Sequence, residues 1–457
     1  MNAIIVSALL GVVMMFAGIV LKKTAQIQGV AILGILALLG TTLVDLNLVG
    51  ADTKTFYNMI ELNAVTAWFN VLITFCALAY FTLFSKAIAA VGKNDADYFA
   101  LLFFVMCGVY LLSTYSNLLI LFLGIEILSI PQYILAGSDK ENIKSNEASL
   151  KYFLMGAFST GILLMGITLI YGATGSFDIF SEGFIAQFQS SAALNTMSFA
   201  GVLLLIIAIG FKVSAAPMHF WTPDVYDGTP TAFTPFMATI AKVSVFVAFI
   251  RLFHLSFGNV SNDWQTAIAV MIVLTLLIGN LTAVYQQSVK RMMAYSSIAQ
   301  AGFMLFAIYS LNNLAWKGLI LYSVAYTLAS LGVFAVLIKM KDYTYEGFNG
   351  LAKKEPVMAA TATICLLSLA GIPLTGGFFA KYYVLSAAVE QGKWIGIVIF
   401  AVLMAAISAY YYFRLIRSIY FAEGEAALSY TPSSLEKTFL LINALLVILL
   451  GVLPGIL

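Results

Sequence analysis

Long apolar runs separated by short polar segments extend along the whole chain of 457 residues. A helix that crosses the hydrocarbon core of a bilayer needs about 20 mostly apolar residues. By this measure the pattern predicts fourteen transmembrane helices, near residues 3–21, 28–48, 64–84, 97–114, 116–136, 150–172, 197–221, 231–254, 264–286, 292–310, 316–338, 357–387, 394–418 and 438–456. The longest connections, near 173–196 and 419–437, are of loop size. We therefore predict an all-α polytopic membrane protein with one transmembrane domain over residues 1–457.

Two boundaries in this pattern depend on few residues. The fourth and fifth spans are separated by the polar stretch STYSN at residues 113–117. The chain begins MNAIIVSALLGVVMMFAGIV, which has neither a basic leader nor a small-residue cleavage site. We therefore expect this segment to be the first span and not a removable signal peptide.

The composition agrees with a membrane protein. Hydrophobic residues make up 62% of the chain and charged residues 10%, whereas soluble domains have roughly 45–50% and about 25%. These values exclude a soluble enzyme, a nucleic-acid-binding protein and a disordered chain, so the expected surroundings are the lipid bilayer. Cys76, Cys107 and Cys365 lie far apart in apolar runs, which favours small buried side chains over a disulfide or metal site.

The distribution of cations predicts the orientation of the chain. Cytoplasmic loops of membrane proteins carry an excess of Lys and Arg. The loops after the odd-numbered spans hold fifteen cations: Lys22, Lys23, Lys86, Lys93, Lys140, Lys144, Lys290, Arg291, Lys339, Lys341, Lys353, Lys354, Arg414, Arg417 and Lys437. The opposite set holds four: Lys54, Arg251, Lys317 and Lys393. This asymmetry supports the count of fourteen and places both termini on the periplasmic side.

Four cations and one acid remain within or near the ends of predicted spans. They are Lys151, Lys212, Lys242, Lys381 and Glu126. An ionisable group at the bilayer centre costs about 2.5–3.5 kcal/mol on insertion scales, and such residues usually face a polar interior and mark ion or proton paths. Burial disfavours a charged ammonium and a nearby carboxylate favours it, so a buried Lys–Glu pair changes protonation as a unit. A row of such lysines is a physical route for a proton relay.

Structural roles are the alternative for three of these residues. Lys151 lies four residues after Glu147 and fits a surface ion pair as well as an interior site. The side chain of Lys381 could extend to the membrane interface. Glu126 could be a neutral, hydrogen-bonded acid with a structural role. Lys212 and Lys242 lie too deep in their spans for such an extension.

Two spans contain helix-breaking residues beside a lysine. In GFKVSAAPMHFWTPD, Pro217 follows Lys212 by five residues, and in LAGIPLTGGFFAKYYVL one proline and two glycines precede Lys381. Broken helices at corresponding positions of two halves indicate a transporter site, although glycine and proline are common in membrane helices generally. The broken spans are the seventh and the twelfth. Their odd offset predicts inverted repeats of spans 4–8 and 9–13, near residues 97–255 and 264–419.

Three stretches resemble the antiporter-like subunits of respiratory complex I. They are KVSAAPMHFWTPDVYDGTPTAFTPFMATIAKVSVFVAFIR, EASLKYFLMGAFSTGILLMGITLIYGATGS and QQSVKRMMAYSSIAQAGFML. The resemblance extends from the fourth to the thirteenth span. It implies a fold of fourteen helices with two inverted five-helix repeats, which agrees with the count made from the apolar runs.

The resemblance also implies roles for single residues. Glu126 matches the family's carboxylate on the fifth helix, and Lys212 matches its partner lysine on the seventh. Lys242 matches the central lysine on the eighth helix, and Lys381 matches the family's residue on the twelfth. Secondary roles fall to Lys151 on the sixth helix and to His219 near the break in the seventh. Two roles are open for His219: assistance in proton uptake, or a hydrogen bond to the backbone at the break. We expect His254 to lie at the membrane interface.

Two features favour the N-type among the family's members. M-type subunits have a glutamate where this chain has Lys381, and L-type subunits have a long extension after the last span, where this chain stops at Leu457. Mrp-type cation/proton antiporter subunits share many of these motifs and remain the alternative.

The implied function is that of a non-redox subunit in a proton-translocating NADH:quinone oxidoreductase of a bacterial inner membrane. The chain has no Walker loop, no strand–GxGxxG–helix unit and no iron–sulfur cysteine cluster. NADH, FMN, iron–sulfur clusters and quinone would therefore belong to other subunits, and the partners would be neighbouring membrane-arm subunits. The expected proton order is uptake near Lys151 and Lys212, transfer through Lys242 and exit by Lys381, with coupling through the Glu126–Lys212 pair. A sodium/proton antiporter and a purely structural membrane subunit are the competing classes.

Overall fold

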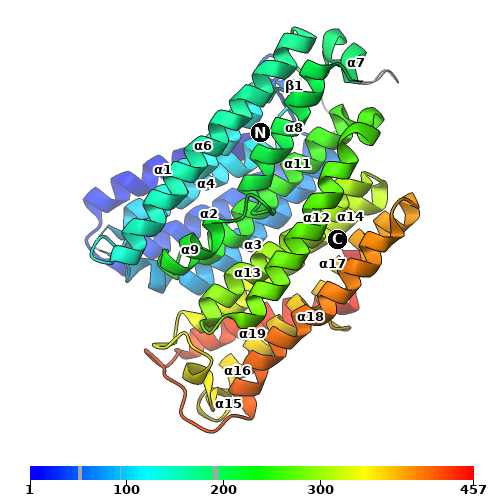
Figure 1. The fold of residues 1–457 in the computed structure, drawn as a ribbon. Coiled ribbons are helices and arrows are strands. Elements are labelled where there is room, and N and C mark those ends of the chain that lie inside the picture. Colours follow the sequence, from blue (N-terminus) through cyan, green and yellow to red (C-terminus); the bar gives the residue numbers. More distant parts are fainter. Residues whose placement is uncertain (50–53, 93, 189–193, 457) are drawn as a thin grey trace.

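Long helices make up most of the chain. The computed structural model describes residues 1–49, 54–92, 94–188 and 194–456 (Figure 1). The first half contains α1 (Asn2–Val20), α2 (Thr24–Asn47), the two-residue strands β1 (Lys54–Thr55) and β2 (Ile60–Glu61), α3 (Ala64–Ala89), α4 (Asp95–Thr114), α5 (Leu118–Ala136), α6 (Ile143–Thr174), α7 (Glu182–Phe188), α8 (Thr196–Lys212) and α9 (Trp221–Gly228). β1 and β2 form an antiparallel pair, with Lys54 opposite Glu61.

The second half continues the bundle. It contains α10 (Thr234–Phe236), η1 (Met237–Ala241), α11 (Lys242–Ser256), η2 (Gly258–Val260), α12 (Ser261–Tyr285), α13 (Val289–Ser310), α14 (Asn313–Leu337), η3 (Glu346–Phe348), α15 (Leu351–Lys354), α16 (Pro356–Ala370), α17 (Gly376–Gln391), α18 (Ile395–Tyr420), α19 (Ser434–Val452) and η4 (Pro454–Ile456). The all-α polytopic architecture predicted from the apolar runs is confirmed.

Twelve helical segments of the described residues are long and apolar enough to cross a membrane. The two remaining expected spans are interrupted. In the seventh, α8 ends at Lys212 and a non-helical stretch, 213–220, precedes α9; in the twelfth, residues 371–375 separate α16 from α17. Both breaks occur where the proline and glycine residues predict them, because proline removes a backbone donor and prevents continuation of the helix. The total of fourteen spans and the inverted repeats stay predictions.

Side-chain caps explain two helix boundaries. α4 and α5 are separate helices, as predicted, and the side chain of Asn117 accepts a hydrogen bond from the amide of Leu119 at the start of α5 (2.9 Å). α6 begins at Ile143 and not near residue 150, since Asn142 accepts a bond from the amide of Lys144 (3.0 Å). The sixth span is therefore longer than its apolar run.

The eighth expected span changes its helical type halfway along. The short helix α10 passes into a π-helical turn, η1, and α11 then begins at Lys242. π-Helical turns are rare and occur frequently at functional sites. The apolar pattern predicts a plain helix here and does not reveal the turn.

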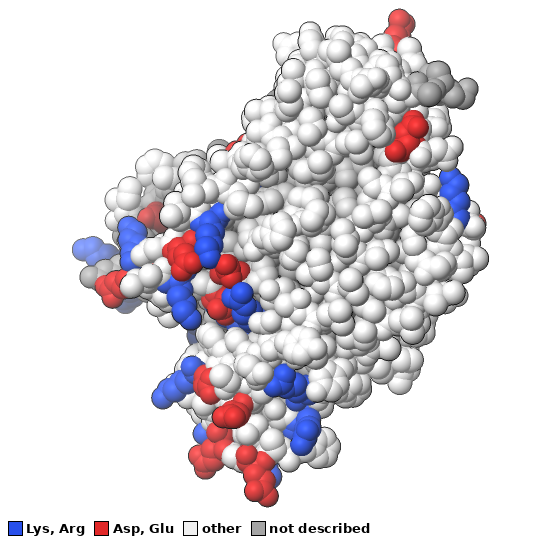
Figure 2. All heavy atoms as spheres, viewed as in Figure 1, with Lys and Arg blue, Asp and Glu red and all other residues white. Residues whose placement is uncertain are grey.

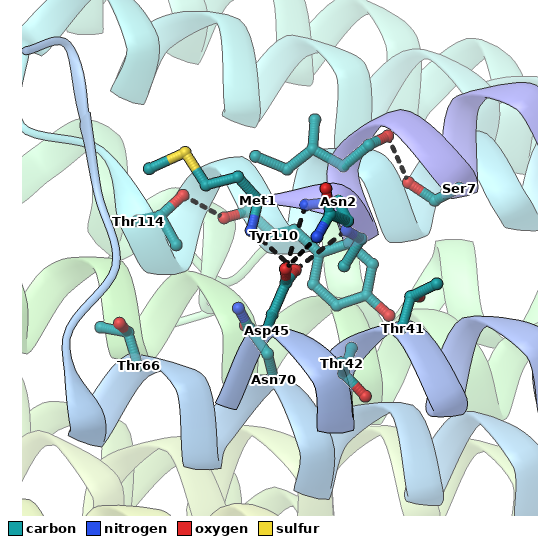
Figure 3. Close-up of polar contacts among 12 residues, drawn as sticks. Met1, Asn2, Ser7, Thr41, Thr42, Asp45, Thr66, Asn70, Tyr110 and Thr114 are labelled. Carbon is teal, nitrogen blue, oxygen red and sulfur yellow. Dashed lines mark hydrogen bonds and ion pairs between the residues drawn. The ribbon is translucent and has the colours of Figure 1, made fainter. Parts of the chain in front are cut away.

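Asp45 of α2 holds the beginning of α1 (Figure 3). Its carboxylate accepts hydrogen bonds from the amide (3.2 Å) and the side chain (2.8 Å) of Asn2 and from the amide of Ala3 (3.0 Å). The amino group of Met1 lies 2.6 Å from the same carboxylate. A negative charge satisfies the free amides at a helix N-terminus, so Asp45 caps α1 from a neighbouring helix.

The visible charged side chains gather mainly towards one end of the helices, around α9 and α15 at the lower left (Figure 2). This asymmetry agrees with the unequal numbers of loop cations. Three residues assigned to loops are instead buried: Arg251, Lys290 and Lys339 are only 1%, 4% and 2% exposed. Backbone carbonyls or a carboxylate replace water around each of them. Lys93 lies outside the described residues.

Candidate functional site

Lys212 is the last residue of α8, immediately before the break. Its ammonium group donates hydrogen bonds to the hydroxyls of Ser129 (3.1 Å) and Tyr133 (3.2 Å) on α5. The last turn of a helix exposes unpaired carbonyls and favours a cation. The break therefore gives this lysine a polar position inside an apolar bundle.

Glu126 lies on α5, three residues before Ser129. One of its carboxylate oxygens accepts a hydrogen bond from the hydroxyl of Thr160 on α6 (2.7 Å). Glu126 and Lys212 do not form a direct ion pair among the described residues; the hydrogen bonds of Lys212 go to two hydroxyl groups instead. Both residues are therefore held by hydroxyl groups, Glu126 by Thr160 of α6 and Lys212 by Ser129 and Tyr133 of α5.

Glu126 is half-buried on an otherwise apolar stripe of α5. Leu123, Ile130 and Ile134, which recur with helical spacing around it, are 45%, 51% and 54% exposed. A carboxylate at this depth is unfavourable against hydrocarbon. In the single chain, the Glu126 carboxylate therefore lies on an apolar side of the bundle formed by exposed residues of α5.

Lys242 begins α11 directly after the π-helical turn and is 2% exposed. Its ammonium group donates to the hydroxyl and the carbonyl of Ser297 on α13. The ring centre of Tyr226, on α9, lies 5.6 Å from it. Neutral groups therefore make up its described contacts.

Lys381 is 7% exposed and reaches from α17 back across the break to the end of α16. Its ammonium group donates to the carbonyl oxygens of Leu369 (2.9 Å) and Ala370 (3.0 Å). The ring centre of Phe303 lies 4.7 Å away. Lys381 satisfies carbonyls that the interrupted helix leaves without intrahelical partners.

A set of polar side chains that the sequence reasoning missed surrounds the carbonyl of Leu369. The amide of Gln300 donates to this carbonyl (2.9 Å) and to the hydroxyl of Tyr412 (3.1 Å). The hydroxyl of Tyr322 donates to the other end of the Gln300 side chain, and the hydroxyls of Tyr412 and Ser296 are hydrogen-bonded to each other. All four residues are buried.

These contacts connect the surroundings of Lys242 and Lys381. Ser297 binds Lys242, and its neighbour Ser296 begins the chain of contacts that leads through Tyr412 and Gln300 to the carbonyl bound by Lys381. The sequence segment YSSIAQ at residues 295–300 contains a pattern that predicts these polar residues in the bundle interior. Ser296, Ser297 and Gln300 are polar residues at helical spacing within a span.

Lys151 belongs to a charged cluster at the membrane surface. Its side chain is 41% exposed and forms ion pairs with Glu147 and Asp224, both at 2.7 Å. Arg291 of α13 lies 3.0 Å from the same Asp224. The structure therefore gives Lys151 the surface pairing that was the alternative to an interior site.

Asp224 links three helices within this cluster, because Lys151 comes from α6, Arg291 from α13 and Asp224 itself from α9. Partial burial by itself raises the pKa of the Asp224 carboxyl. The hydrogen bonds and positive charges of Lys151 and Arg291 outweigh this effect and hold the pKa below its ordinary value. The cluster lines a cavity of about 240 Å³.

The two histidines differ in position. His219 lies in the break between α8 and α9, is 8% exposed, and its Nδ1 atom has no hydrogen-bond partner. His254 is exposed near the end of α11, with its ring 6.0 Å from that of Trp316. His219 thus lies at the expected break and His254 near a helix end; the interfacial position of His254 stays a prediction.

The described residues contain no group of three or more His, Cys, Asp or Glu side chains arranged to hold a metal ion. The three cysteines are buried and free. Hydroxyls, amides and lysines supply the polar groups of the bundle interior.

The fold and the site together define a polytopic membrane subunit of the antiporter-like class. A family described as NADH:quinone oxidoreductase/Mrp antiporter, transmembrane, matches residues 116–408. The chain belongs to this family. Curated relatives named NADH-quinone oxidoreductase subunit N include one from Cytophaga hutchinsonii, which is 39% identical over 100% of this chain and 98% of its own length. Another, from Flavobacterium psychrophilum, is 35% identical over 100% and 99%.

Solved structures have the same fold. A chain of respiratory complex I from Thermus thermophilus with bound aureothin superimposes with a TM-score of 0.85 at 30% identity, over 99% of this chain and 97% of that one. A chain of the Mrp complex from Dietzia sp. DQ12-45-1b has a TM-score of 0.84 at 19% identity, over 99% and 94%. The second likeness concerns the fold alone.

Proposed function

We propose that this chain is a proton-translocating, non-redox subunit of a bacterial NADH:quinone oxidoreductase. Membership of the family, with subunit N relatives matched over nearly their full length, supports the assignment to such a complex. NADH, FMN, iron–sulfur clusters and quinone belong to its other subunits. This chain acts in the plasma membrane beside neighbouring membrane-arm subunits.

The observation that carries the proposal is a pair of buried polar contact sets, one at Lys242 and one at Lys381, which meet at the adjacent residues Ser296 and Ser297 of α13. Ser297 holds the first lysine, and the carbonyl of Leu369 holds the second and also accepts from Gln300. Buried hydroxyls and an amide fill the interval. Each lysine passes its proton when the charge of its neighbour changes, because the charged form of a buried lysine is sensitive to nearby charge.

Glu126 and Lys212 couple this relay to the rest of the complex. Lys212 binds hydroxyl groups of α5, the helix that carries Glu126, so a small shift of α5 against α8 changes the distance between the two charges. The half-buried position of Glu126 on a lateral apolar face supports contact with an adjoining subunit. His219 and Lys151 take secondary positions on the uptake side, which we assign to the cytoplasm, with both termini in the periplasm.

Replacement of Lys242 by Met tests this function. In inverted membrane vesicles that contain the assembled complex, we expect NADH-driven proton uptake per NADH oxidised to fall sharply, because methionine cannot bind a proton. Lys341→Met removes an exposed lysine and serves as the matched control with unchanged uptake. Full uptake by Lys242→Met would contradict the proposal, and sodium/proton exchange that is independent of NADH would favour the Mrp-type alternative.

A further inference from the structure

Lys290, at the start of α13, is a buried cation that the relay does not use. It is 4% exposed, and its ammonium group donates to the backbone carbonyls of Asp227 (2.8 Å) and Thr229 (2.7 Å). The ring centre of Tyr343 lies 5.8 Å away. No carboxylate of the described chain forms an ion pair with it. The carboxylate of Asp227 acts on Lys290 electrostatically without a direct contact. A buried lysine whose hydrogen bonds all go to backbone carbonyls is unusual, and such residues are often functional in membranes.

Two cavities approach Lys290 from different sides. The first, of about 240 Å³, is lined by Asp227 and by Arg291, the neighbour of Lys290 in sequence. The second, of about 400 Å³, is lined by Thr231 and Tyr343. Each cavity thus includes residues that contact Lys290 or adjoin it. Both cavities are large enough to hold water molecules close to this lysine.

Two elements connect Lys290 with Lys242. On α9, Tyr226 places its ring 5.6 Å from the ammonium group of Lys242, and the next residue, Asp227, binds Lys290 through its carbonyl. On α13, Lys290 and Ser297 are seven residues apart, which puts them on one face about 10 Å apart along the axis. Ser297 holds Lys242. The two lysines therefore share both of their supporting elements.

The bonds of Lys290 suit a group that changes its protonation. A carboxylate partner would favour the charged form and oppose release of the proton. An ammonium has three N–H donors, and the neutral amine that remains after release of one proton has two. Two donors are enough for the two carbonyls, so the lysine keeps its position in both states.

We propose that Lys290 is a further proton-carrying residue, which loads Lys242 from the charge-rich side of the membrane. One N–H bond of the Lys290 ammonium breaks, and the neutral amine of Lys242 gains that proton. The amine of Lys290 then takes a proton from water in the adjoining cavities. This inference rests on the proposed function of Lys242 and adds the residue that supplies it.

The test compares two replacements of Lys290 in the assembled complex. Lys290→Arg keeps a positive charge and N–H donors for both carbonyls but does not release a proton in proteins. We expect the Arg variant to assemble and to lose roughly tenfold in the initial rate of NADH-driven proton uptake, equivalent to about 1.4 kcal/mol on the barrier. Lys290→Met should show at least the same loss. Lys341→Met is the matched control.

The outcomes separate this inference from the proposed function. Normal uptake by Lys290→Arg would overturn the inference and leave Lys290 as a cap for the carbonyls of α9. Normal uptake by Lys242→Met would overturn the proposed function itself. If the Arg variant does not assemble, Lys290→Ala with added ethylamine gives the second measurement. If ethylamine restores proton uptake in this variant, the result supports proton transfer at position 290. If ethylamine leaves the lowered uptake of the variant unchanged, the inference is overturned.

Discussion

The ammonium group of Lys381 lies 2.9 Å from the carbonyl oxygen of Leu369, on the other half of the broken twelfth span. This side chain satisfies the open end of α16. Under the proposed function it also binds and releases a proton, and a change in its protonation would then alter the bonds that hold the break together.

Replacing Lys381 by Met should stop most proton translocation and loosen the end of α16. The variant leaves the carbonyl of Ala370 without its lysine donor, and an unsatisfied buried group costs about 1–3 kcal/mol. We expect lower proton uptake in vesicles and faster amide hydrogen exchange in residues 366–372 of the purified complex. Lys317→Met, at an exposed position of α14, should change neither. Normal uptake would show that Lys381 is only structural.

Gln300→Leu should slow translocation without abolishing it. This change removes the second donor to the carbonyl of Leu369 and the partner of Tyr322. The loss of one net hydrogen bond, about 1 kcal/mol, corresponds to a roughly fivefold lower rate. The measurement is the initial rate of NADH-driven uptake, with the exposed Gln26→Leu as control. An unchanged rate would mean that the polar set around Gln300 does not take part in the relay.

Asp224→Asn should weaken the attachment of α9 to α6 and α13 by an amount that does not vary between pH 8 and pH 5. A carboxyl whose pKa is lowered by folding contributes stability above its ordinary pKa of 3.8, and this contribution is lost only as the pH falls through the lower folded value. The effect is small, since exposed ion pairs contribute about 0–1 kcal/mol.

Thermal unfolding of the purified complex at pH 8, 6.5 and 5 measures this difference. Asp263→Asn, which changes an exposed acid of α12, is the control. A difference between wild type and Asp224→Asn that disappears by pH 5 would show that the folded pKa is not lowered.

Asp45→Asn should free the first turn of α1. The amide side chain accepts fewer bonds than the carboxylate and does not balance the positive helix end, and loss of an N-terminal cap costs about 1 kcal/mol. Amide exchange in residues 2–6 should become faster, whereas Asp97→Asn, at an exposed site in the first turn of α4, should not affect them. Equal exchange in wild type and Asp45→Asn would refute the capping role.

Much of the architecture follows from the sequence alone. Apolar runs of bilayer length predict the helices, because a backbone inside hydrocarbon must satisfy its own hydrogen bonds. Proline and glycine predict the two interruptions beside Lys212 and Lys381, which the structure confirms. The positions of Lys242 and Glu126 within predicted spans make them candidates for function in the sequence, since charge is scarce in a membrane. Their roles stay predictions.

Only the tertiary structure decides which polar groups meet. Glu126 and Lys212 are predicted as a pair, but Glu126 accepts from Thr160 and Lys212 donates to Ser129. Lys151 forms ion pairs with acids at a partly exposed position. Lys290 resembles a loop cation in the sequence, yet α9 folds over it and replaces water with two carbonyls. Hydropathy records how unfavourable a residue is in lipid. The partners that offset this penalty come from helices distant in sequence, and their identity depends on how those helices pack.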